Sequence, residues 1–223
     1  MERIDLFAVV HKALRAELFA STTLSGRTDF GSELEAARAA SSARALVGLL
    51  EEHAEHEDAV VLPELAALAP ELHAAIAADH AKLDALHREI SALATRIEGS
   101  AADAERVALG RRLYDRIGRL TADHLHHMQR EEVEVNRTLW AHRSDEALTA
   151  LHALIVRRIV PARMATWLAA MFAASSLPER AALLASVRAT VPPNLFGELT
   201  APARAALGEV GWSEATEAAG YAA

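Results

Sequence analysis

The stretch His53-Ala-Glu-His-Glu57-Asp-Ala-Val-Val-Leu-Pro63 places an imidazole and a carboxylate four residues apart. The later stretch His127-Met-Gln-Arg-Glu131-Glu132 repeats this spacing. Residues four apart on an α-helix lie on one face, one turn from each other. A single histidine precedes each pair at a similar interval, His11 before the first and His80 before the second. We interpret this pattern as a duplicated helical hairpin.

The repeated residue types are those that bind transition metals. In a helical bundle, a His and a Glu one turn apart can bind one ion or bridge to a second, while a paired helix supplies another His. Such a set suits iron, manganese or zinc. The order of the residues predicts two iron ions, with an approximate two-fold axis between them. The six predicted metal ligands are His11, His53, Glu57, His80, His127 and Glu131.

The composition is typical of a helical protein with a sizeable core. Hydrophobic residues make up 52% of the 223, aromatic residues only 4%, and Gly and Pro are sparse. The chain has no Cys, which excludes disulfides, thiolate ligands and iron–sulfur clusters. Because no Gly-x-Ser-x-Gly elbow or Gly-rich phosphate loop is present either, the sequence offers no nucleophilic apparatus.

Charge and hydropathy limit the partners that we expect. The net charge of −8 argues against binding to nucleic acid. The most apolar stretch, residues 167–177, is too short to cross a bilayer, and the first residues do not resemble a secretory signal. We therefore expect a cytoplasmic protein with no membrane partner.

Caps and breakers divide the first part of the chain into helices. We expect a first helix over residues 4–21 and a loop over 22–31. A capping box of Ser32 and Glu35 opens a second helix, which Pro63 ends or kinks. The third and fourth helices are predicted at 70–99 and 102–140. The predicted fold is therefore all-α, an antiparallel four-helix bundle over residues 1–142.

Residues 143–223 have a different character. Four prolines divide this part into shorter helices, none of which carries a His-x-x-x-Glu pair. We expect a C-terminal helical extension packed on the bundle, with Trp167 and Trp212 as its packing anchors. Three roles stay open for it, namely homodimerisation, shielding of the metal site and additional core.

Other histidines compete with the six predicted ligands. His56 and His124 lack an acidic residue four positions later, so we treat them as outer contacts of the site. His73 and His87 form a heptad stripe with His80, and successive members lie about 10.5 Å apart along a helix. One dinuclear site cannot use all three, and we expect His73 and His87 to be surface or packing residues.

The four histidine segments together resemble the hemerythrin-like domain. The resemblance covers residues 1–142 and rests on Asp-Leu-Phe-Ala-Val-Val-His11, Ala-Asp-His80-Ala-Lys-Leu and the two His-x-x-x-Glu stretches. It implies an antiparallel four-helix bundle with a non-haem di-iron centre that binds dioxygen, peroxide or nitric oxide. Oxygen-carrying members use five His and two carboxylates, with a His-x-x-x-His pair on the third helix. Here Ile76 and Asp84 stand four residues before and after His80.

The missing imidazole changes the chemistry that the resemblance implies. With two His per iron and two bridging Glu, both metals keep open positions, which favours turnover over reversible carriage. Our lead hypothesis is a di-iron oxidoreductase that reacts with hydrogen peroxide or dioxygen. Three alternatives stay open: an iron-handling or nitrosative-stress protein, an O2- or NO-binding sensor, and an oxygenase acting on an organic substrate.

Overall fold

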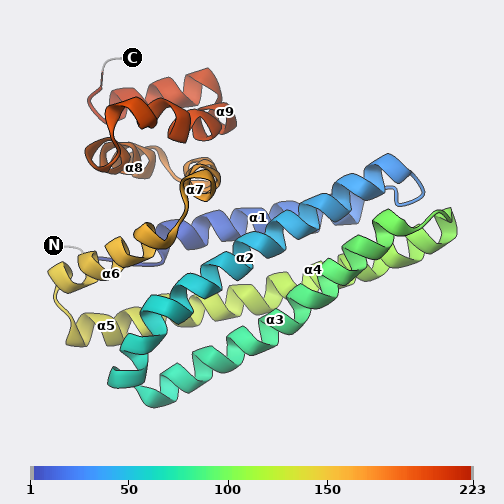
Figure 1. Ribbon diagram of the computed structural model, residues 1–223, viewed down its shortest axis with the longest axis horizontal. Coiled ribbons are helices and arrows are strands. Elements are labelled where there is room, and N and C mark those ends of the chain that lie inside the picture. Colours follow the sequence, from blue (N-terminus) through green and yellow to red (C-terminus); the bar gives the residue numbers. More distant parts are fainter. Residues whose placement is uncertain (1–2, 222–223) are drawn as a thin grey trace. The chain divides into compact units, whose positions relative to one another are not determined.

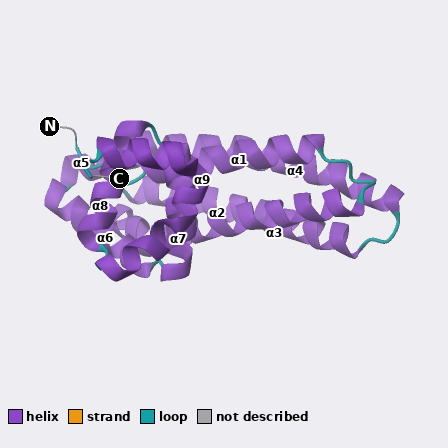
Figure 2. Cartoon of the chain, turned by 90° about the horizontal axis from the view of Figure 1, so that it is seen from above, coloured by secondary structure: helices purple, strands orange, loops and turns teal. Residues whose placement is uncertain are grey.

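The computed structural model describes residues 3–221, and every regular element among them is a helix, as predicted. The helices are α1 Ala8–Arg27, α2 Glu33–Leu68, α3 Pro70–Gly99, α4 Asp103–Arg130, the π-helix η1 Glu131–Val135, α5 Asn136–His142, α6 Asp145–Arg158, α7 Pro161–Ala174, α8 Leu177–Thr190 and α9 Pro193–Ala218. Figure 2 shows how little of the described chain is left as loop between them.

Helices α1 to α4 form an antiparallel bundle (Figure 1). Pairs of contacting residues run in opposite directions along neighbouring helices, which fixes the antiparallel order. These pairs are Arg44–Glu98 and Asp58–His80 between α2 and α3, Arg96–Glu105, Glu89–Arg116 and Lys82–Asp123 between α3 and α4, and Arg15–Glu132 and Thr22–Thr121 between α1 and the α4–η1 segment.

The first helix begins and ends later than predicted. Residues before Ala8 are held outside the helix because the Arg3 guanidinium bonds to Asp145 and to the carbonyls of Trp140 and Arg143. At the other end α1 continues to Arg27, and the connection to α2 is confined to residues 28–32. The predicted loop over 22–31 is therefore largely helical.

The second helix starts directly after Ser32, as the capping residues predicted, but it does not end at Pro63. The Ser32 side chain accepts a hydrogen bond from the Glu35 amide at 3.4 Å, while the Glu35 carboxylate accepts from the Asp29 amide instead of completing the box. Pro63 lies inside α2, which runs on to Leu68. The hydrogen bond that proline removes falls on the carbonyl of Ala59, an exposed residue, so water can replace it.

The described chain divides into two compact units. The first comprises Arg15–Ile155 with the residues up to Phe7, and the second comprises Ala8–Leu14 with Val156 onward. The second unit contains its own apolar cluster, in which Phe172 and Trp212 contact each other with ring centroids 5.8 Å apart. Helices α6 to α9 are each shorter than α2 and α3, in line with the expectation that prolines divide this part of the chain.

No helix within residues 3–221 combines the length and the apolar character that crossing a bilayer requires.

Candidate metal centre

The two His-x-x-x-Glu pairs lie on α2 and α4 and point into the bundle. One helical turn brings His53 Nε2 to 3.1 Å from Glu57 Oε1, and His127 Nε2 to 3.3 Å from Glu131 Oε2. All four side chains are buried. The apolar side chains that the sequence offers as neighbours of the site are buried as well, namely Leu14, Leu49, Leu50, Val60, Leu83 and Leu120.

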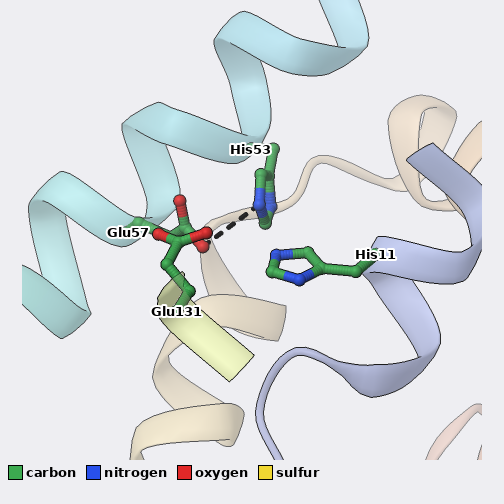
Figure 3. Close-up of side chains that lie close together, drawn as sticks. All are labelled: His11, His53, Glu57 and Glu131. Atoms are coloured by element: carbon green, nitrogen blue, oxygen red, sulfur yellow. Dashed lines mark ion pairs between the residues drawn. The ribbon is translucent and has the colours of Figure 1, made fainter. Parts of the chain in front are cut away.

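The structure brings all six predicted residues together, in two groups of four. Within each group, one potential ligand atom from every residue lies within 4.8 Å of the others. Figure 3 shows the group of His11, His53, Glu57 and Glu131, in which the two imidazoles face the two carboxylates. The second group has the same two glutamates with His80 and His127, whose Nε2 atoms are 3.2 Å apart. Glu57 and Glu131 therefore belong to both groups.

A π-helix begins at Glu131, where the sequence predicted an uninterrupted α-helix. The Asn136 amide donates to the Glu131 carbonyl, five residues back, instead of four. The extra residue in this turn shifts the following backbone relative to the α4 segment that carries His127. Single π-turns inside α-helices are frequent at functional sites. The sequence Glu-Glu-Val-Glu-Val contains no Pro or Gly that would have signalled it.

Two aspartates lie behind the imidazoles. The Nδ1 of His80 donates to Asp58 Oδ1 at 2.7 Å, and the Nδ1 of His127 lies 3.7 Å from Asp79 Oδ2. Asp58, the residue that follows the first His-x-x-x-Glu pair, therefore stands behind the His80 ring. Glu132, the corresponding residue of the second pair, does not: its two oxygens accept from the Arg15 guanidinium at 2.7 and 3.0 Å, which ties α1 to the end of α4.

The electrostatics of the ligand set fit a bound cation. Burial alone would lower the pKa of His80, but its bonds to Glu57 and Asp58 outweigh burial and raise that pKa to about 9. Burial, and then the charge of Glu57, raises the pKa of Glu131 well above its usual value. Without metal the site therefore retains protons that offset the crowded carboxylates. A metal ion placed among them would take over this role and displace the protons.

The hemerythrin HHE cation-binding domain model matches residues 3–155. The chain belongs to the hemerythrin family. Neither a curated protein nor a solved structure matches it. The matched segment carries all six residues of the two groups, so this hemerythrin domain is a metal-binding domain.

Other candidate residues of the hemerythrin domain lie outside both groups. His56 is buried, and His73 is partly exposed. Tyr114 of α4 is not a candidate for a buried centre, because 46% of its surface is exposed and its ring lies against Gly26. We expected His87 to be a surface or packing residue. It is buried, and its Nε2 lies 3.1 Å from the Nε2 of His124, a contact that the sequence did not predict.

A pocket of about 180 Å³ lies beside one of the six candidate ligands, His127. It lies between α3 and α4, and His127 forms part of its wall. The rest of its lining is mainly polar: Asp79, Lys82, Leu83, Asp123 and His126. Ion pairs of Lys82 with Asp123 and of Arg130 with Asp79 join the two helices beside it. The pocket has room for a molecule of a few atoms next to the His127 ring.

Proposed function

We propose that the domain holds two iron ions and that this centre reacts with hydrogen peroxide or dioxygen. The observation that best supports this proposal is that Glu57 and Glu131 belong to both groups of four. A carboxylate has two oxygens, so each can contact two neighbouring ions. In this assignment His11 and His53 complete one ion's set, and His80 and His127 complete the other's.

The donor set supports iron and leaves room for a reactant. Two imidazoles with carboxylate oxygen are the donors that non-haem Fe(II) centres use, with further positions open to a small ligand. When bound, two irons supply redox equivalents and Lewis acidity. The residues of the chain would position the ions: Asp58 orients the His80 ring by accepting a hydrogen bond from its Nδ1, and the burial of all six side chains keeps bulk water out.

The proposed substrate is limited by size. The pocket beside His127 admits a peroxide or a diatomic molecule, and its polar wall suits hydrogen peroxide, which donates and accepts hydrogen bonds. In disproportionation one peroxide is oxidised to dioxygen and a second is reduced to water, so two H2O2 give one O2 and two H2O. His126 and Asp123 line the approach and can bind peroxide in passage.

An oxygen electrode tests the proposal directly. Protein loaded anaerobically with Fe2+ is expected to release dioxygen from added hydrogen peroxide, and its visible spectrum is expected to change with dioxygen or nitric oxide. The matched control is the same protein loaded with Zn2+, which accepts similar ligands but has no redox chemistry. The proposal fails if the iron protein neither consumes peroxide nor changes its spectrum with either gas.

A further inference from the structure

The π-helix η1 separates the part of α4 that carries His127 from α5. Buried residues recur every four positions along this segment, at His127, Glu131, Val135 and Leu139. In an uninterrupted α-helix each residue turns by about 100°, so three such steps would rotate the last side chain by about 120° from the first. One π-turn takes up one extra residue and removes about 100° of this rotation. The π-turn therefore keeps the metal-site residues and the apolar residues after them on one face.

The π-turn moves one backbone donor away from its α-helical acceptor. In an α-helix the Asn136 amide would donate to the carbonyl of Glu132, four residues back. Here it donates to the carbonyl of Glu131 instead. The Asn136 side chain makes up for this, because its Nδ2 donates to the Glu132 carbonyl at 3.3 Å. One residue thus supplies a donor to both carbonyls, to one from its backbone and to the other from its side chain.

Asn136 is placed as a donor and not as a packing residue. Only 1% of it is exposed, and its Oδ1 has no hydrogen-bond partner among the described residues. A buried polar atom without a partner costs free energy, and an apolar side chain of similar size would avoid that cost. The bond from Nδ2 to the Glu132 carbonyl offsets it. The opposite orientation of the amide would bring two acceptor oxygens together, so Nδ2 faces the carbonyl.

Other contacts fix the chain on both sides of this turn. The carboxylate of Glu132 accepts two hydrogen bonds from the Arg15 guanidinium of α1. Val135 and Leu139 lie in an apolar cluster of the bundle core. If η1 became α-helical, the residues after it would rotate by about 100° relative to those before it. Either this apolar packing or the direction of the Glu131 side chain would then change.

We propose that Asn136 is a positioning residue of the metal centre: its side chain holds the π-turn at Glu131 and so sets the direction of a carboxylate that both groups of four share. Asn136 is not itself one of the six candidate ligands. The inference rests on the proposed dinuclear centre and adds a residue whose removal affects both ions. Asp58, in contrast, stands behind a candidate ligand of one ion only.

Titration of the metal-free full-length protein with Co2+, in competition with a chelator, tests this inference. Asn136→Leu keeps a side chain of similar size and removes the donor to the Glu132 carbonyl. We expect the affinity for both ions to fall about 10-fold, the lower end of the loss when a residue that supports a metal ligand is replaced. The visible spectrum of the bound Co2+ is expected to shift as well. The matched control is Thr138→Val, which removes an exposed bond to another carbonyl four residues back, that of Glu134, and is expected to bind both ions like the wild type.

The outcomes separate this inference from the proposed function. If the wild type and Asn136→Leu hold two ions equally tightly, the centre stands and the positioning role is wrong, even if urea unfolding finds the variant less stable. If only one ion weakens, the effect does not pass through the shared Glu131, and the inference is again overturned. A wild type that binds no metal would overturn both proposals. If the variant does not fold, a crystal structure of the wild type with Zn2+ decides: a bond from Asn136 Nδ2 to the Glu132 carbonyl across a π-turn supports the inference, and an α-helical turn there refutes it.

Discussion

Asp58 offers a test of the proposed centre that leaves the core undisturbed. Its carboxylate accepts a hydrogen bond from the Nδ1 of His80 at 2.7 Å, while 53% of its side chain is exposed. Asp58→Ala removes both the bond and the charge behind the His80 ring without opening a buried cavity. If His80 binds a metal ion through Nε2, the ring loses its fixed orientation and part of its basicity.

The expected effect is a loss of about 10- to 100-fold in the affinity for one of the two ions, the usual consequence of removing a carboxylate behind a metal-bound histidine. This corresponds to about 1.4–2.7 kcal/mol of binding free energy. Because His80 belongs to only one group of four, we expect one ion to weaken and the other to change little.

Competition with a chromophoric chelator under anaerobic conditions measures both affinities. Glu55→Ala is the matched control, because it removes one exposed carboxylate from the same helix without touching His80. If Asp58→Ala and Glu55→Ala have equal effects, the contribution of Asp58 is only its charge. If Asp58→Ala binds both ions as tightly as the wild type, His80 is not a ligand.

Four further substitutions test other parts of the account. Glu57→Ala and Glu131→Ala each remove a carboxylate shared by both groups, so metal content measured by mass spectrometry is expected to fall from two ions toward none; full metal content in both variants would refute the bridging role. In the metal-free protein, His87→Leu is expected to lessen acid sensitivity. The pKa of His87 is about 4 in the folded protein, against an ordinary 6.5. The free energy of unfolding of the wild type is therefore expected to fall by about 2 kcal/mol between about pH 7 and about pH 5, as the unfolded chain takes up a proton that the folded ring does not. Equal losses for variant and wild type in urea unfolding would contradict this. His126→Trp is expected to narrow the pocket and slow azide binding to the iron protein at unchanged metal content; an unchanged rate would exclude this route.

The residues of the centre were predictable because their signal is local. Spacing of four on one helix places His53 with Glu57 and His127 with Glu131, and the helix boundaries at Pro70 and Gly99 follow from residues that begin and end helices. The start of α1 was not predictable in the same way. It depends on Arg3 reaching a carboxylate and two carbonyls near residue 145, a contact that only the folded chain creates.

The features that the sequence missed depend on how helices are placed against each other. The heptad from His80 to His87 indicates one face of α3, but only the register between α3 and α4 brings His87 to His124. Likewise, Asp58 and Glu132 occupy equivalent positions after their His-x-x-x-Glu pairs. Their different partners follow from Arg15 on α1, which pairs with Glu132.

The number of metal ions per chain tests the central claim most directly. Protein purified without chelator and without nickel affinity is analysed by mass spectrometry, before and after anaerobic loading with Fe2+. The account predicts about two irons held per chain by the two groups that share Glu57 and Glu131. A chain that holds no metal after loading would contradict it and leave six buried polar side chains without the cation that we propose for them.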